Sequence, residues 1–352
     1  PLAPRTHLRT GYIQSILLFK RHLVSYPATM TASNIKWIFG GASFVNEETI
    51  GGPEAIQEAL NLLHDAGIES IDTAKSYHHS EQILGKTKAP SRFTIDTKHP
   101  GGWSDVPVTK ESIIATANES LAKLQTDQVD VYYLHCPPRE AALENVLDGI
   151  NTLYKDGKIK RFGLSNFLAE EVDEVVRVAR EKNYILPTVY QGNYSAIARR
   201  QEVEILPTLR RHGIIFYAYS PIAGGFLTKN VDQLIAGGEG RWDKSSQFGS
   251  LYHALYNKPS MLEGLRLWQK ISDETGISKA ELAYRWVAYN SELNAELGDG
   301  VIFGSTKISQ LKETLALIPK GPLSPEIAAK IEDLWKLVEA DSPLDNFNNG
   351  VL

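Results

Sequence analysis

The 352-residue sequence has one cysteine, no excess of basic charge and no long hydrophobic run. The single cysteine, Cys136, excludes an internal disulfide framework and a cysteine-based zinc cluster. Acidic residues outnumber basic ones by 42 to 37, and the net charge of −5 indicates neither nucleic acid nor another polyanion as a partner. The apolar runs are only as long as strands, which argues against a membrane-spanning segment.

The first 29 residues differ from the rest because no acidic residue occurs before Glu47, while Arg and Lys are present. An Arg-rich, acid-poor segment is typical of a mitochondrial transit peptide, and the alternative is an extension that precedes a start at Met30. We expect residues 1–29 to be an extension and residues 30–352 to form one domain. We predict a cytoplasmic location, or a mitochondrial one if residues 1–29 are a transit segment.

From residue 35 onward, short β-branched or aromatic runs alternate with amphipathic stretches of helical period. The eight predicted strands are Ile35–Gly41, Ser70–Ala74, Phe93–His99, Val129–Cys136, Arg161–Phe167, Pro187–Tyr194, Ile214–Ser220 and Gly300–Ser305. Eight parallel strands with eight crossover helices close into a single (β/α)8 TIM barrel. A doubly wound sheet is the alternative, but no Gly-x-Gly-x-x-Gly follows the first run.

Local signals predict where several helices begin and end. A glycine with positive φ is expected after four helical stretches, at Gly67, Gly157, Gly213 and Gly276. N-caps are expected at Ser278, in a capping box with Glu281, and at Ser324, which precedes Pro325. Ser324–Ala340 is predicted to be an additional C-terminal helix. Leu227–Pro259 is predicted to be the longest irregular segment, of the kind that forms lids or binding loops.

A barrel has its active site at the C-terminal ends of its strands, and four reactive side chains occur there. They are Asp72, Tyr77, Lys98 and His135. An ammonium group near a phenol favours the phenolate, which makes the phenol a better acid than its usual pKa near 10 allows. An aspartate would hold the lysine charged, and a neutral histidine would orient a carbonyl group, so the set suits protonation of an oxygen while another group attacks the carbon.

Each of the four residues also has a purely structural interpretation. Asp72 can cap a turn, Lys98 can be a solvated residue of the barrel rim, His135 can be a core histidine and Tyr77 can be a loop residue. The order and strand positions of all four together favour the functional interpretation.

The sequence resembles the aldo-keto reductases over about residues 35–345, and within them the aflatoxin-aldehyde reductase branch. The resemblance rests on the four residues above in their order and on the segments Ile71–Ala74, Asp96–Lys98, Tyr133–His135, Gly163–Asn166, Leu186–Gly192 and Ala223–Thr228. It implies metal-independent transfer of hydride from NADPH to an aldehyde or ketone. Tyr77 would donate the proton, Lys98 and Asp72 would tune its pKa, and His135 would position the carbonyl oxygen.

The resemblance also implies a cofactor site. Nicotinamide contacts would come from Ser165, Asn166, Gln191 and Tyr219. The pyrophosphate would lie beside a loop with Ser220, Pro221, Ile222, Gly224, Gly225 and Leu227, and Arg241 would also contact the cofactor. The start of the eighth helix is an anion site, and Lys307 there would favour NADP over NAD. The other cofactor contacts at the start of this helix and along it would be Gly304, Ser305, Thr306, Gln310 and Glu313.

Some positions depart from that branch. Thr314 stands where the branch usually has Asn, Lys229-Asn230 replaces its Gly-Lys, and an expected Arg aligns near Leu255. The tail Asp345–Asn349 lacks the Arg that can pair with a substrate carboxylate, so neutral aldehydes are expected rather than succinic semialdehyde. Trp242 and Tyr252 are candidate substrate contacts, and with Phe248 they would either line an apolar pocket or simply pack the loop.

Two other function classes remain as alternatives. The first is an NADPH-binding sensor or channel-associated subunit on the same fold, since a fold does not dictate function. The second is a metal-dependent barrel hydrolase, which needs a cluster of His and carboxylate ligands. His78, His79 and His99 lie near the expected barrel mouth, but their spacing is not that of a ligand set. The expected partner is a small carbonyl substrate, and the protein is expected to be a monomer or a homodimer.

Overall fold

Eight parallel strands close into a barrel in the computed structural model, which describes residues 35–46, 50–237, 242–243 and 247–349. The strands follow one another around the barrel in chain order, and the last pairs with the first. They are β1 Lys36–Gly40, β2 Ser70–Asp72, β3 Thr94–His99, β4 Val129–Leu134, β5 Ile159–Ser165, β6 Pro187–Asn193, β7 Ile215–Tyr219 and β8 Gly300–Phe303. The predicted (β/α)8 barrel is confirmed, because a doubly wound sheet would be open. The extension at residues 1–29 lies outside the described residues.

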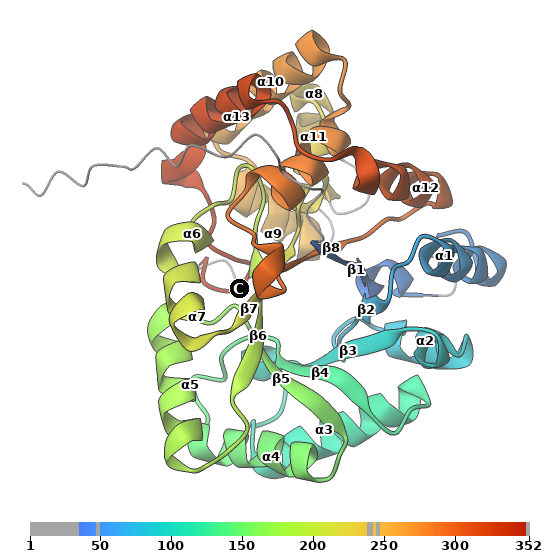
Figure 1. The fold of residues 1–352 in the computed structure, drawn as a ribbon, viewed down its shortest axis with the longest axis vertical. Helices are drawn as coiled ribbons and strands as arrows, with labels where there is room; N and C mark the ends of the chain where they lie inside the picture. Colours follow the sequence, from blue (N-terminus) through green and yellow to red (C-terminus); the bar gives the residue numbers. More distant parts are fainter. Residues whose placement is uncertain (1–34, 47–49, 238–241, 244–246, 350–352) are drawn as a thin grey trace, which may run out of the picture. The chain divides into compact units, whose positions relative to one another are not determined.

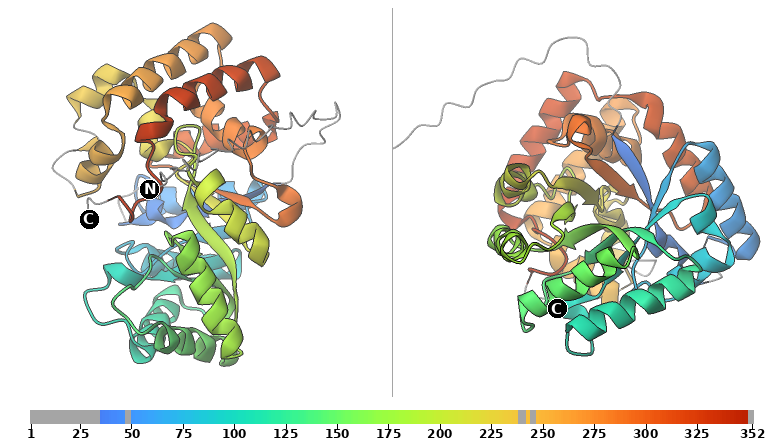
Figure 2. Two further views of the ribbon diagram at one scale, coloured as in Figure 1. Left: turned by 90° about the vertical axis from the view of Figure 1, so that its left-hand side faces the viewer. Right: turned by 60° about the horizontal axis from the view of Figure 1, so that its bottom comes forward.

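Helices connect successive strands and lie on the outside of the barrel (Figures 1 and 2). The first seven are α1 Pro53–Asp65, α2 Ser80–Lys86, α3 Lys110–Leu124, α4 Leu143–Lys155, α5 Ala169–Glu181, α6 Gln201–Glu204 and α7 Leu206–His212. The remaining ones are α8 Val231–Ala236, α9 Gln247–Tyr256, α10 Pro259–Thr275, α11 Lys279–Arg285, α12 Ile308–Leu317 and α13 Pro325–Val338. The last is the predicted additional helix, and it packs beside α10 (Figure 1). No helix in the described ranges is both long and apolar enough to cross a membrane.

The predicted helix boundaries follow from local chemistry. The glycines at 67, 157, 213 and 276 all have a φ between 66° and 74°, where a residue with a Cβ is strained. The Ser278 hydroxyl accepts a hydrogen bond from the Glu281 backbone N–H at 3.2 Å, and the Ser324 hydroxyl accepts one from Ile327 at 3.4 Å. Both serines therefore cap the helices that they were expected to cap.

The segment Leu227–Pro259 was expected to be irregular, and this prediction was wrong for its described part. The segment contains α8 and α9. Asn230 caps α8: its side-chain oxygen accepts a hydrogen bond from the Gln233 backbone N–H at 2.8 Å, and the Gln233 side-chain oxygen accepts one from the Asn230 backbone N–H at 2.9 Å. α8 has only six residues, so its helical period was a weak signal. In α9, Tyr252 packs against Gly224 of another segment, a long-range contact that the sequence does not reveal.

Two apolar clusters support the site. The larger lies between the strands and the surrounding helices. The smaller fills the barrel interior and consists of Ile38, Val131, Tyr133, Val189, Tyr217 and Ile302. Because side chains of paired strands form layers inside such a barrel, this apolar layer leaves the space at the strands' C-terminal ends to polar side chains.

Candidate active site

The four predicted catalytic residues lie together at the C-terminal end of the barrel. Asp72 is the last residue of β2, Lys98 is in β3, His135 directly follows β4, and Tyr77 lies in the turn after β2. The Lys98 Nζ donates to both Asp72 carboxylate oxygens, at 2.6 and 2.7 Å. It lies 5.1 Å from the centre of the Tyr77 ring, and the Tyr77 and His135 ring centres are 5.7 Å apart. The structure therefore brings all four residues into one cluster.

The Asp72–Lys98 pair is held as an ion pair away from water. The side chain of Lys98 is fully buried and that of Asp72 is 4% exposed. Burial by itself lowers the pKa of Lys98, but the adjacent Asp72 carboxylate and other nearby acidic groups outweigh it and raise the pKa above 10.5. A third acceptor, the Thr73 carbonyl oxygen at 2.7 Å, satisfies another ammonium proton. The lysine is therefore a fixed cation beside the phenol ring.

His135 is a neutral imidazole at ordinary pH. Burial and the nearby Lys98 ammonium both hold its pKa well below the usual 6.5. Its Nδ1 lies 3.2 Å from the Ser76 hydroxyl. If that hydroxyl donates to Nδ1, the proton resides on Nε2 and can be donated to a carbonyl oxygen.

The residues expected to contact nicotinamide adjoin the four predicted catalytic residues, Asp72, Tyr77, Lys98 and His135, which are called the tetrad below. Gln191 in β6 donates through Nε2 to Asp72 Oδ1 at 2.7 Å. The Asn166 amide donates to the His135 carbonyl oxygen at 2.8 Å and accepts from the Tyr219 hydroxyl at 2.7 Å. Ser165, the last residue of β5, is buried and its hydroxyl is 3.2 Å from the Asn166 amide nitrogen. Hydrogen bonds thus tie Gln191 to the Asp72–Lys98 pair, and Ser165, Asn166 and Tyr219 to the backbone of His135.

The predicted pyrophosphate loop follows β7 and has an unusual backbone. Ser220, Gly224 and Gly225 have φ values of 57°, 63° and 95°. A Cβ at Gly224 would lie 2.0 Å from a ring carbon of Tyr252, so only glycine fits there. Of the other predicted contacts, Pro221 and Ile222 connect these positions, Leu227 is buried, and Arg241 lies outside the described residues.

The segment after β8 leads into α12, as the predicted phosphate site requires. Lys307 is exposed at the N-cap, and its side chain makes no cap bond. Within the described residues, the buried hydroxyl oxygen of Ser305 has no hydrogen-bond partner. Gln310 accepts from the Thr306 backbone N–H and hydroxyl, both at 3.1 Å. Gly304 begins this segment, and Glu313 is exposed farther along α12.

The two predicted substrate contacts are buried instead of facing an open cleft. Trp242 is 1% exposed and Tyr252 is 3% exposed, and their ring centres are 5.9 Å apart. The Trp242 indole N–H donates to the Gly224 carbonyl oxygen at 3.1 Å. Of the two interpretations left open above, this conformation matches loop packing, since both rings lie against the loop that contains Gly224. The Phe248 side chain lies outside the described part of the structure.

Sequence reasoning missed the aromatic wall beside His135. The Trp103 ring centre lies 4.8 Å from that of His135, and Phe347 from the C-terminal tail lies 5.6 Å from Trp103. The position of Trp103, five residues after Lys98, was a usable signal because it follows a strand end. Phe347 had no such signal, since its contacts span most of the chain.

A guanidinium group does lie near this wall, although the tail contributes none. Arg139, in the loop after β4, lies over the Phe347 ring at 5.2 Å. It donates to Glu171 at 2.7 Å and to the Asn348 side chain at 2.5 Å. These bonds tie the guanidinium to α5 and to the C-terminal tail.

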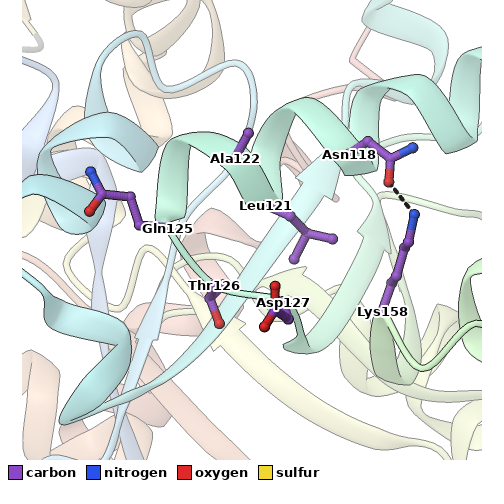
Figure 3. Close-up of a pocket in the computed structure, with 7 residues that line it drawn as sticks. All are labelled: Asn118, Leu121, Ala122, Gln125, Thr126, Asp127 and Lys158. Carbon is purple, nitrogen blue, oxygen red and sulfur yellow. Dashed lines mark hydrogen bonds between the residues drawn. The ribbon is translucent and has the colours of Figure 1, made fainter.

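A separate surface cavity of about 360 Å³ lies at the opposite end of the strands (Figure 3). It is lined by the end of α3 and the residues that precede β4 and β5, namely Asn118, Leu121, Ala122, Gln125, Thr126, Asp127 and Lys158. The Lys158 ammonium donates to the Asn118 side-chain oxygen at 2.5 Å. The cavity contains none of the predicted site residues, and active sites of this fold lie at the other end.

Within the described ranges, His, Cys, Asp and Glu side chains form no group of three that could hold a metal ion. His99 accepts from the Gly101 backbone N–H at 2.9 Å, and burial lowers its pKa to about 4.

Comparison with known proteins agrees with this geometry. The sequence profile described as "Aldo/keto reductase family" matches residues 36–336. The chain belongs to the aldo/keto reductase family. It is therefore an enzyme, an oxidoreductase of a family that in general uses NADH or NADPH, and reduction of a carbonyl group is the reaction the family implies.

Several named relatives match most of the chain. It is 41% identical to "Oxidoreductase sirO" of Leptosphaeria maculans over 87% of this chain and 95% of that protein. It is 34% identical to human "Aflatoxin B1 aldehyde reductase member 4" over 79% of this chain and 88% of that protein. Human "Aldo-keto reductase family 7 member A3" is also 34% identical, with the same coverage. The predicted resemblance to the aflatoxin-aldehyde reductases is confirmed, and a fungal oxidoreductase is more similar still.

Proposed function

We propose that this enzyme reduces aldehydes, and with them some ketones, to alcohols by hydride transfer from NADPH, with Tyr77 as the proton donor. The observation that carries the proposal is the Tyr77 ring 5.1 Å from a buried Lys98 ammonium that is itself paired with Asp72. A cation beside the phenol stabilises the phenolate that remains after proton donation. A neutral His135 beside the same ring would orient the carbonyl oxygen toward the phenol.

The residues present fit a nicotinamide cofactor. A buried Ser305 hydroxyl without a partner in the described structure, next to a helix start with no side-chain cap, suits a phosphate group. Lys307 adds a positive charge there, which supports NADPH over NADH. Gly224 and Gly225 permit close approach of the backbone to the pyrophosphate. When bound, NADPH supplies the hydride.

The protein's own residues do the remaining work. Asn166, Gln191 and Ser165 would bind the nicotinamide amide, and Tyr219 would stack against its ring and so select one face. Tyr77 would transfer the phenolic proton to the oxygen of the former carbonyl group, while Lys98 stabilises the resulting phenolate. Positioning of this kind is what a protein contributes to a cofactor reaction.

We further propose that the preferred substrates are neutral aldehydes, aromatic ones included. Trp103 and Phe347 provide an apolar wall beside His135. Arg139, the cation over that wall, is already paired with Glu171, so a substrate carboxylate would have to compete with Glu171 for the guanidinium. A cytoplasmic location and a monomer or homodimer remain predictions, to be checked by fractionation and by light scattering.

The decisive test is Tyr77→Phe. The substitution removes only the proton donor, so aldehyde reduction should fall roughly 100- to 10,000-fold. The affinity for NADPH, measured by fluorescence titration, should stay nearly unchanged. Tyr154→Phe, which alters an exposed tyrosine in α4, is the matched control and should keep full activity.

Full activity of Tyr77→Phe would overturn the assignment. Tight NADPH binding by the wild-type protein without turnover on any member of a carbonyl panel would favour the sensor instead. Loss of activity in a chelator would revive the metal-dependent alternative.

A further inference from the structure

Asp96 lies in the barrel interior next to the tetrad, and the mechanism above does not use it. It is the register partner of Asp72 across β2 and β3, so both carboxyl groups point to the same side of the sheet. It is also two residues before Lys98 on β3, which puts their side chains on one face. Asp96 is 1% exposed. Two carboxyl groups and one ammonium group therefore share a buried space.

The two carboxyl groups differ in the hydrogen bonds that they receive. Asp72 accepts from the Lys98 ammonium on both oxygens and from Gln191 on one of them. Asp96 accepts on Oδ1 from the Val131 backbone N–H at 3.1 Å, and its buried Oδ2 has no partner in the described part of the structure. A buried carboxylate is stable only where donors surround it. The negative charge therefore belongs on Asp72 and a proton belongs on Asp96.

The surrounding charges are consistent with this distribution. Burial, Asp72 and Asp130 raise the pKa of Asp96 to about 7, and Lys36 and Arg161 oppose them. The tyrosine side chains of Tyr133 and Tyr217 also line the barrel interior. The titratable and charged groups around Asp96, by element, are Lys36 on β1, Asp72 on β2, Lys98 on β3, Asp130 and Tyr133 on β4, Arg161 on β5 and Tyr217 on β7.

We propose that Asp96 is a positioning residue of the tetrad: it holds a proton while Asp72 carries the charge, and its ionisation slows carbonyl reduction. The inference rests on the proposed reductase function. Ionisation of Asp96 adds a negative charge to the buried cluster around Lys98. That charge opposes formation of the Tyr77 phenolate and makes the phenol a weaker acid.

The first test is the pH profile of the reductase. In the wild-type enzyme, kcat for aldehyde reduction should fall roughly tenfold with a midpoint near pH 7 as Asp96 ionises, as expected for one charge in a buried site. Asp96→Asn keeps the shape of the protonated acid but cannot ionise. This variant should match the wild-type kcat at pH 6 and lack the fall. The same fall in the Asn variant would overturn the proposal.

Two further variants move the midpoint in opposite directions, which a merely structural role would not do. Asp130→Asn removes a negative charge that raises the pKa of Asp96, so the midpoint should move to lower pH. Lys36→Gln removes a positive charge that lowers this pKa, so the midpoint should move to higher pH. Midpoints that stay unchanged in both variants would count against Asp96 as the titrating group.

A measurement on the wild-type holoenzyme needs no variant to fold and no turnover. With ¹³C-carboxyl aspartate incorporated, one buried carboxyl resonance should titrate near pH 7. If no aspartate titrates in the neutral range, the proposal fails even in an active enzyme. If one does titrate but no carbonyl compound is reduced, the protonation of Asp96 is supported and the proposed function is the part that fails.

Discussion

Asp72→Asn tests how much the buried Asp72–Lys98 ion pair contributes to the unfolding free energy of the protein. The substitution keeps the size of the side chain and removes its charge. The Lys98 ammonium, which is fully buried, then loses the carboxylate at 2.6 and 2.7 Å and keeps only neutral acceptors such as the Thr73 carbonyl oxygen. Removing one partner of a buried pair leaves an uncompensated charge and typically costs about 3–5 kcal/mol of unfolding free energy.

The cost should depend on pH in a direction that the structure fixes. In the wild-type protein, the folded-state pKa of Lys98 is above the unfolded value of 10.5, so the pair stabilises the fold at neutral pH and that contribution is lost only as pH rises through the folded pKa. Without Asp72, burial is the main influence and lowers this pKa. The variant should therefore lose stability as pH falls, with a cost of about 3 kcal/mol at pH 9 that grows toward about 5 kcal/mol at pH 6.

Urea unfolding followed by circular dichroism at the two pH values measures the difference. Asp333→Asn is the matched control, because Asp333 is 77% exposed and pairs with Lys336 at the surface; its effect should be small at both pH values. The double variant Asp72→Asn/Lys98→Met should regain part of the lost stability, since no buried charge remains. A cost equal to that of the control, or a cost larger at pH 9 than at pH 6, would refute the reasoning.

Two further predictions concern the ligands. Lys307→Ala should weaken NADPH binding roughly tenfold and NADH binding much less, since only NADPH has a phosphate for this cation; fluorescence titrations with both cofactors measure it, and equal losses would contradict a phosphate role. Trp103→Ala should raise the KM for a neutral aromatic aldehyde several-fold with little change in NADPH affinity, and a carboxylate-bearing aldehyde of similar size should be a poorer wild-type substrate because Arg139 is occupied. Steady-state assays check both statements, and an unchanged KM or a preference for the acid would contradict them.

The barrel and the tetrad were predictable from sequence because their signals are local. Each strand is a short apolar or aromatic run, and several helix ends carry a glycine or serine that marks them, as at Gly276 and Ser324. A barrel also has a directional rule, since the C-terminal ends of all strands meet on one side. Residues at strand ends, such as Asp72 and Lys98, could therefore be grouped before any contact between them was known.

The aromatic residues were not predictable because their contacts are set by distant parts of the chain. Trp242 and Tyr252 pack against Gly224, which lies in another segment, and only that contact decides whether they face a ligand or the loop. Phe347 reaches Trp103 from the opposite end of the barrel sequence. Neither period nor composition carries information about such long-range contacts, so the sequence left two interpretations of Trp242 and Tyr252 open and gave no sign of the contact between Trp103 and Phe347.

The C-terminal tail joins the proposed substrate and cofactor walls into one unit. Asp345 is fully buried and accepts from the Phe347 and Asn348 backbone N–H groups, which folds the tail into a tight turn. That turn directs Phe347 to Trp103 on one side, while the Asn346 N–H donates to the Tyr219 hydroxyl on the other at 3.3 Å. The tail turn that Asp345 stabilises therefore includes both the residue that contacts Trp103 and the residue that contacts Tyr219. If the proposed substrate and cofactor contacts are right, a substitution of Asp345 should therefore change both the KM for an aldehyde and the affinity for NADPH.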